Sequence, residues 1–332
     1  MRRSLLVACL LASVAGCTHL PPSQYRTFDI SPGPAAELDY RGIPLRSGQI
    51  IVSDQGSRLG FFVSLLGERF EPWIHSGVVA IEEREPFVYE AMGDIGPYLS
   101  GPPSDATKGR IRRTSLATYL ARQRIAAIYD PPLGVDASRV VEFARAQFLA
   151  RTPFDPYFDD RDRQKLYCTE LVAAALEHGG ALPIVPVRFS QNSSITVVRE
   201  WLKMDSDSIV LAGSLVADSH RVALLSPRFS SGEIAAFFAV KRELHRRFTN
   251  DQRLGFLFQW GLTGVGFRQQ VAQFVADGMA EGQVHGSGEI DTVVRQIADR
   301  MLGIVDATTL ETASRPQREE LGGRDDGPVI QP

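Results

Sequence analysis

Short apolar runs alternate with turn-forming residues over the first two thirds of the chain, a pattern typical of a mixed α+β domain. Residues 73–81 and 87–92 are predicted as two strands, because the polar stretch 82–86 separates them as the turn of a hairpin. Residues 47–52 predict a turn followed by a strand, and residues 124–129 predict a strand that ends at a proline pair. These strands are expected to form an antiparallel sheet.

Apolar residues at helical spacing predict the helices of the same region. Asp136 is a suitable N-cap for a helix that runs to about residue 150. A second helix begins at Cys168 and ends at the glycine pair 179–180, a C-terminal signal. We also expect helices at residues 56–67 and 114–124, and closing strands at residues 209–216 and 221–225.

The pattern changes after residue 228, where four segments have helical periodicity and no strand is expected. These segments are residues 232–248, 252–260, 267–279 and 290–304. The expected organisation is a signal peptide (1–16), a tether rich in Pro and Ser (17–40), an α+β domain (41–228), a helical extension (229–310) and a disordered tail (311–332).

The first seventeen residues have the features of a lipoprotein signal. Arg2 and Arg3 precede an apolar run much shorter than the ~20 residues of a membrane-spanning helix. The small residues Ala15 and Gly16 then stand directly before Cys17. We therefore predict lipidation at Cys17 and anchoring to a membrane, with Thr18 favouring the periplasmic face of the outer membrane. A simple secretory signal is the alternative.

The composition excludes some classes of binding partner and cofactor. The net charge of −3 is nearly balanced and no basic stripe occurs, so we expect no nucleic-acid binding. The six histidines neither pair at i, i+4 nor sit beside a cysteine pair, so we expect no metal site and no cofactor. The oligomeric state does not follow from the sequence.

Cys168 is the candidate nucleophile. Of three cysteines, Cys9 lies in the signal peptide and Cys17 is expected to carry lipid, which leaves Cys168 without a disulfide partner. A helix N-terminus stabilises a thiolate. A nucleophile needs a base and an orienting group, and we nominate His75 on one predicted strand and Glu90 on the next. If residue 81 pairs with residue 86, Glu90 shares a face with His75.

The alternative is that these residues are structural, since a lone cysteine on an apolar helix is most often a small buried hydrophobe. However, three motifs in this order resemble a known family: His-Ser-Gly-Val-Val from His75, Val-Tyr-Glu-Ala around Glu90, and Tyr-Cys-Thr-Glu-Leu-Val from Tyr167. They are similar to the permuted NlpC-type papain-like cysteine hydrolases of the YiiX/YaeF-like group, over residues 44–228. Gln49 and Thr169 depart from that group's usual Asp and Ser.

The resemblance implies a circularly permuted papain-like domain with a catalytic triad of Cys168, His75 and Glu90. It also implies a substrate amide in a peptidoglycan peptide or a related N-acyl compound. We expect Tyr167 to line the substrate pocket or to add a hydrogen bond. Two alternatives stay open: thioester-based acyl transfer to lipid, and a non-catalytic envelope lipoprotein that binds a partner.

Overall fold

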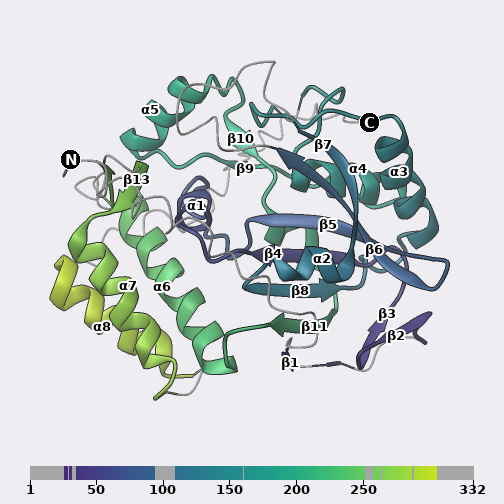
Figure 1. The fold of residues 1–332 in the computed structure, drawn as a ribbon. Helices are drawn as coiled ribbons and strands as arrows, with labels where there is room; N and C mark the ends of the chain where they lie inside the picture. The colour runs from purple at the N-terminus through teal and green to yellow at the C-terminus, as the bar shows by residue number, and fades with distance from the viewer. Residues whose placement is uncertain are drawn as a thin grey trace, which may run out of the picture.

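The structure is a computed structural model that describes residues 26–28, 30–31, 35–93, 109–159, 161–250, 257–261, 264–285 and 288–304. Within these residues an antiparallel sheet of seven strands forms the centre of the fold, in the order β1-β11-β8-β4-β5-β6-β7 (Figure 1). Its strands are β1 (Arg26–Phe28), β4 (Ile50–Asp54), β5 (His75–Glu82), β6 (Glu85–Gly93), β7 (Gly109–Ser115), β8 (Ile125–Tyr129) and β11 (Arg221–Ser226). The predicted α+β class with an antiparallel sheet is confirmed.

Short strand pairs lie beside the main sheet. They are β2 (Leu38–Tyr40) with β3 (Ile43–Leu45), β9 (Val187–Arg188) with β10 (Ser208–Ile209), and β12 (Phe258–Gly261) with β13 (Gly264–Phe267). Part of the segment expected to be a tether is thus structured, because β1 pairs with β11 and β2 pairs with β3. The signal peptide, Cys17 and the predicted tail lie outside the described residues.

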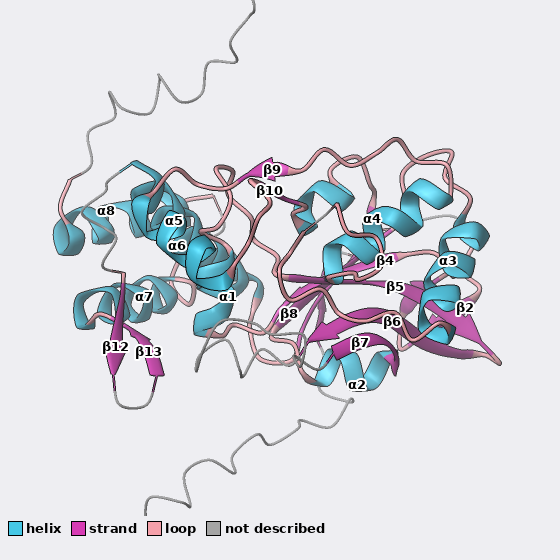
Figure 2. Ribbon diagram, turned by 90° about the horizontal axis from the view of Figure 1, so that it is seen from above, coloured by secondary structure: helices cyan, strands magenta, loops and turns pink. Residues whose placement is uncertain are grey.

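Helices cover both faces of the sheet (Figure 2). α3 (Ala137–Leu149) and α4 (Cys168–His178) lie on one face, whereas α2 (Leu116–Ala121) lies on the other. The alternation of side chains along a strand explains this division. Val78 and Ala80 of β5 belong to the hydrophobic cluster that includes α4, whereas Val79 belongs to the cluster that includes α2.

The C-terminal helices pack on the end of the sheet region next to α1 (Arg58–Val63). They are α6 (Ser231–Asn250), α7 (Gln269–Glu281) and α8 (Ile290–Leu302). Phe237 of α6 meets Phe61 of α1 edge to face, with ring centroids 5.5 Å apart. Buried side chains on both sides of residue 228 belong to one hydrophobic cluster, so α6 shares its core with the sheet and α4.

Several predicted elements differ from the structure in their bounds or in their type. Residues 114–124 begin as the end of β7, since Ser115 pairs with Phe87, and the helix starts only at Leu116. The predicted strand 209–216 is a two-residue strand followed by a 3-10 helix, Ala212–Val216, because Glu71 accepts the N–H of Gly213. The segment expected as helix 252–260 ends in β12, and its first residues lie outside the described range. α5 (Ser193–Leu202) was not anticipated.

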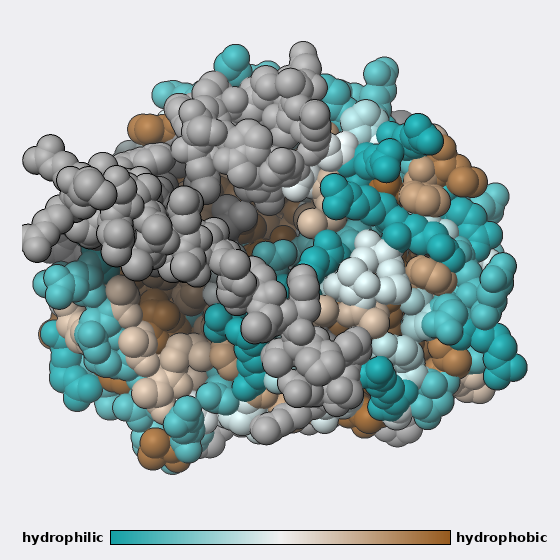
Figure 3. All heavy atoms as spheres, viewed as in Figure 1, coloured by the Kyte–Doolittle hydropathy of each residue, from teal (hydrophilic) through white to brown (hydrophobic). Residues whose placement is uncertain are grey.

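β7 forms one edge of the sheet, and its outer surface is charged. Arg110, Arg112 and Arg113 are exposed along this strand. Hydrophilic residues also gather on the side of the molecule where Figure 1 places β7 (Figure 3). Positive charge along an edge strand opposes pairing with another chain. Within the described residues, no helix combines the length and apolarity needed to cross a membrane.

Candidate active site

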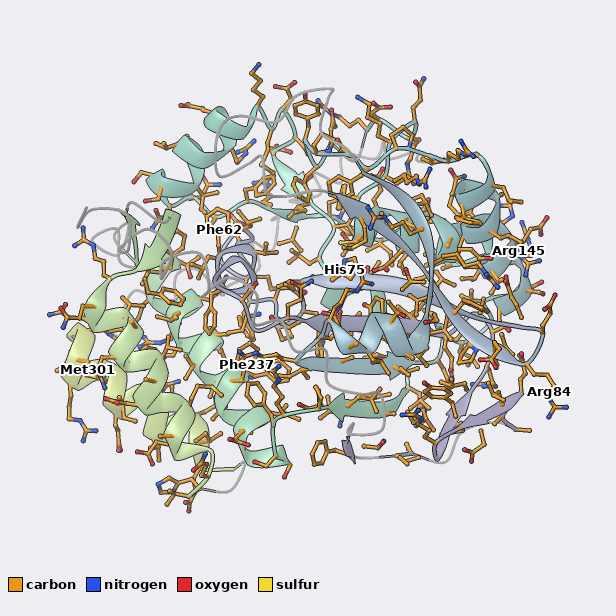
Figure 4. All side chains as sticks on the ribbon, in the orientation of Figure 1. Phe62, His75, Arg84, Arg145, Phe237 and Met301 are labelled. Atoms are coloured by element: carbon orange, nitrogen blue, oxygen red, sulfur yellow. The ribbon has the colours of Figure 1, made fainter. Side chains whose placement is uncertain are left out.

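The β5–β6 hairpin brings Glu90 to His75. Ile81 pairs with Pro86 and Val78 with Tyr89, which is the register considered from the sequence. Continuing this alternation places Glu90 opposite Gly77, on the face of the sheet that carries His75. The Nε2 atom of His75 lies 2.8 Å from Oε2 of Glu90. His75 is near the centre of the molecule, between the helical side that carries Phe62 and Phe237 and the hairpin turn that carries Arg84 (Figure 4).

Glu90 is a fully buried carboxylate, 0 % exposed, with partners on both oxygens. Its other oxygen, Oε1, accepts hydrogen bonds from Thr114 Oγ1 at 2.6 Å and from Arg122 Nη2 at 2.5 Å. Burial alone would raise the pKa of Glu90, but the contacts with His75, Arg122 and Thr114 lower it to about 2. Glu90 is therefore ionised at neutral pH.

The His75 imidazole is held by three elements. The residue is 8 % exposed, and its ring stacks on Tyr119 of α2, with ring centroids 5.8 Å apart and an angle of 20°. The Tyr119 hydroxyl lies 2.8 Å from Ser53 Oγ, and Ser53 of β4 is the cross-strand partner of His75. Packing from β4, β6 and α2 thus restricts the rotation of the imidazole.

Burial by itself would lower the pKa of His75. The neighbouring Cys168 side chain and the contact with Glu90 together raise the pKa to about 10. These contacts favour the protonated form of His75. Because Nε2 contacts Glu90, the nitrogen available to the Cys168 side chain is Nδ1.

Cys168 is the first residue of α4, after the extended N-cap Tyr167. The positive end of the helix dipole favours a negative charge at this position. Hydrogen bonds fix its neighbours: the Tyr167 hydroxyl accepts the N–H of Val210, and Thr169 Oγ1 donates to the carbonyl of Val210 at 2.6 Å. Ser76 Oγ donates to the carbonyl of Cys168 at 3.1 Å. The thiol is partly exposed, as a nucleophile must be.

Cys168 and His75 meet although they approach from opposite faces of the sheet. Ser76, Val78 and Ala80 face α4, whereas His75 and Glu90 face α2. Cys168 Sγ lies 4.0 Å from the carbonyl oxygen of Ile74, the residue directly before His75, so Cys168 lies beside the start of β5. The thiol and the imidazole thus reach each other around the start of β5.

Of the two roles expected for Tyr167, the structure shows the hydrogen bond. Its side chain is 0 % exposed, and its hydroxyl accepts the Val210 N–H inside the core. A side chain without exposed surface gives nothing to a substrate, so we correct the substrate-binding prediction to a structural role. Gln49 is likewise buried and bonded to Asp130, away from the triad. Cys17 lies outside the described residues.

Four residues of the site were not recognised in the sequence: Ser53, Thr114, Tyr119 and Arg122. Tyr119 and Arg122 are three positions apart within the predicted helical segment 114–124, a spacing that puts two residues on one face of a helix. Nothing in that spacing indicated that this face covers the His75 strand. In the part of the chain that the structure describes, no three His, Cys, Asp or Glu side chains converge as a metal site.

Comparison with known proteins gives a weak structural likeness. The chain is similar to the crystal structure described as metalloprotein YiiX from Escherichia coli O157:H7, with a TM-score of 0.42 and 14% sequence identity. The match covers 53% of this chain and 96% of that chain. No protein-family model matches the chain, and no curated protein sequence matches it either.

Proposed function

We propose that this protein is a cysteine hydrolase that cleaves an amide bond, with Cys168 as nucleophile, His75 as acid and base, and Glu90 as the group that orients His75. The observation that carries the proposal is the 2.8 Å contact between His75 and Glu90 at the start of β5, where Cys168 Sγ lies 4.0 Å from the carbonyl oxygen of Ile74. A nucleophile, a base and an orienting carboxylate are the three parts that this chemistry needs. The resemblance of the sequence to permuted NlpC-type hydrolases supports the same assignment.

The proposed reaction starts from a thiolate–imidazolium pair. The Cys168 sulfur attacks the substrate carbonyl carbon, and the resulting oxyanion accepts a hydrogen bond from the Cys168 N–H, since N–H groups in a first helical turn lack acceptors within the helix. The imidazolium of His75 gives its proton to the nitrogen of the leaving amine as the C–N bond breaks. Water then attacks the thioester while His75 takes its proton, which releases the carboxylic acid and restores the pair.

Glu90 keeps this pair ready for reaction. As a buried carboxylate it stabilises the imidazolium electrostatically and fixes which nitrogen faces the thiol. Arg122 and Thr114 hold its second oxygen, so that the carboxylate cannot rotate away from His75. Orientation by an anchored carboxylate is the role that the third member of such triads performs.

The proposed substrate is an amide of the cell envelope, in peptidoglycan peptides or related N-acyl compounds, and the proposed location is the periplasmic face of the outer membrane through lipid at Cys17. Palmitate labelling in cells that is absent in Cys17→Ser supports the anchor; equal labelling of both proteins rejects it.

Mass spectrometry of the products separates hydrolysis, which gives a free acid, from transfer, which gives an acylated acceptor.

The pairing of Cys168 with His75 is tested by alkylation. In the full chain carrying Cys9→Ser and Cys17→Ser, Cys168 is the only thiol. We expect the iodoacetamide rate to reach a plateau well below pH ~8.5, the ordinary titration range of a free thiol. We expect His75→Ala to lose that plateau. An ordinary thiol titration in both proteins would reject the proposed mechanism.

A further inference from the structure

Helix α6 holds the segment that leads into His75. This segment, residues 67–74, connects α1 to β5. His245 Nε2 lies 2.9 Å from the carbonyl oxygen of Gly67, and Lys241 Nζ donates to the carbonyl oxygen of Pro72 at 2.8 Å. Lys241 and His245 are four residues apart on α6 and both are buried, so one face of the helix binds the segment at both of its ends.

Lys241 also binds the strand that pairs with His75. Its Nζ lies 2.6 Å from Oδ2 of Asp54, the last residue of β4, and both side chains are 0 % exposed. Asp54 directly follows Ser53, the cross-strand partner of His75. The N–H of Ile74 donates to the carbonyl of Ser53 at 3.0 Å. One buried ammonium group therefore connects the two chain segments that meet at His75.

Separating the Lys241 ammonium group from Asp54 and Pro72 would cost free energy. The Lys241 ammonium lies 5.4 Å from the ring centre of Phe237 and 6.0 Å from that of Phe61, so aromatic rings surround its remaining sides. Burial lowers the pKa of Lys241, and Asp54 opposes that shift. Moving Pro72 or Asp54 away would leave a buried charge without its partner, which is strongly unfavourable.

Two further contacts restrain the same segment. Trp73 packs edge to face on Phe238 of α6, with ring centroids 5.1 Å apart. The Glu71 carboxylate accepts the N–H of Trp73 at 2.8 Å and the N–H of Gly213 at 2.7 Å. The three residues before Ile74 thus each have a fixed polar or aromatic partner, and α6 supplies two of them.

We propose that Lys241 is a positioning residue for His75, and that α6 is consequently part of the catalytic unit. This inference rests on the proposed function, because it assigns α6 a task in the Cys168–His75 pair. Lys241 acts through the Pro72 carbonyl and Asp54 and has no contact of its own with the reacting atoms. The region after residue 228, outside the resemblance in sequence, thereby contributes to the geometry of the site.

The test is the pH profile of Cys168 alkylation in Lys241→Met combined with Asp54→Asn, which removes both charges of this ion pair together. At pH 6 we expect the rate to fall about tenfold toward that of His75→Ala, because loss of the imidazolium leaves little thiolate at this pH. At pH 9.5, where a free thiol is ionised, the rate should stay within about twofold of the parent protein. All proteins are full chains with Cys9→Ser and Cys17→Ser.

Arg247→Met is the matched control. Arg247 lies on the same helix, is also 0 % exposed, and binds Glu243 and Asp299 at the side of α8. Its loss removes a comparable buried charge without touching residues 67–75, so the pH 6 rate should be preserved. An equal loss in Arg247→Met would show that general destabilisation is responsible and would overturn the inference.

A second variant allows the same test if the first variant does not fold. Lys241→Gln with Asp54→Asn keeps a polar pair in the core, but the shorter side chain does not reach Pro72 from the same backbone position. We expect the same selective loss at pH 6. A parent-like profile in a folded variant overturns the inference alone. Absence of any His75-dependent rate in the parent protein overturns the proposed function as well.

Discussion

At the scale of single residues, Glu90 shows how specific contacts outweigh burial. Burial ordinarily raises the pKa of a carboxylate. The pKa of Glu90 is instead lowered to about 2, because His75, Arg122 and Thr114 contact both of its oxygens. The same contact helps to raise the pKa of His75 to about 10. The opposite directions of the two shifts describe one ion pair, and each group stabilises the charged form of the other.

Glu90→Gln should therefore lower the pKa of His75. Loss of the carboxylate charge removes a stabilising influence on the imidazolium, so His75 gives up its proton at lower pH. The basic limb of the kcat/KM profile should move toward neutral pH, with kcat/KM reduced roughly 100-fold or more. NMR titration of the His75 ring measures the shift directly, without an assay for substrate.

Glu82→Gln is the control for this prediction. Glu82 ends β5 on the same hairpin, but binds Arg113 and Arg145, with Arg145 on α3. Its replacement should leave the His75 titration unchanged. If Glu90→Gln also leaves that titration in place, Glu90 is not the group that sets the charge of His75.

At the scale of elements, Gly77 determines how closely β5 and β6 approach at the site. A Cβ atom at this position would lie 2.5 Å from Val88 Cγ1 and 2.8 Å from the carbonyl oxygen of Tyr89. Neither is the free end of a long side chain, so the strands themselves would have to move. Glu90 lies directly across from Gly77, which ties this spacing to the contact between His75 and Glu90.

Gly77→Ala should thus destabilise the fold and disturb the ion pair together. We expect a loss of about 1–3 kcal/mol in the free energy of unfolding by urea, the usual cost of overpacking. The His75 titration should also move to lower pH. Gly288→Ala, where no atom lies within 4 Å of the added Cβ, should change neither property. Normal stability in Gly77→Ala would mean that the hairpin adapts without strain.

At the scale of the whole molecule, the hydrophobic core is continuous from the sheet through α4 to α6 and α8. Charged groups are enclosed in this core, including Lys241 with Asp54 and Arg247 with Glu243. Glu71 lies near the first pair, and burial raises its pKa to about 7, although the N–H groups of Trp73 and Gly213 oppose the shift. The stability of the molecule therefore depends on pH through buried acids as well as through His75.

The sign of this dependence follows from the two pKa values of Glu71, about 7 when folded and 4.5 as the ordinary value. Between these values the folded state holds a proton that the unfolded state has lost, so the free energy of unfolding falls as pH rises from 4.5 to 7. Glu90 acts in another window: its contribution is present above pH 4.5 and is lost as pH falls toward 2.

Glu71→Gln should flatten the decline between pH 4.5 and 7, an effect on the order of 1–3 kcal/mol. Urea unfolding at several pH values measures it. The exposed Glu142 on α3 provides the control substitution, Glu142→Gln, which should leave the slope in place. A slope that survives in Glu71→Gln would assign the pH dependence to other buried groups.

The sequence by itself determined the local parts of this protein. Asp136 caps α3, Cys168 opens α4, and β5 and β6 form a hairpin, whereas the register that places Glu90 beside His75 was not fixed by the sequence. Caps, helical periodicity and a short hairpin turn each depend on neighbouring residues, so their signals lie within a few positions of the chain. The candidate triad could be nominated for the same reason, with each residue identified by its own motif.

Only the tertiary structure decided how these parts meet. Cys168 and His75 are neighbours although they are 93 positions apart in the chain. Tyr119 and Arg122 come from α2 and its C-terminal end, and Lys241 of α6 binds Asp54. The same long-range packing buries Tyr167, which was expected to line the substrate pocket or to add a hydrogen bond. Such contacts depend on the order of strands and on which helix covers which face, and these are properties of the packed molecule as a whole.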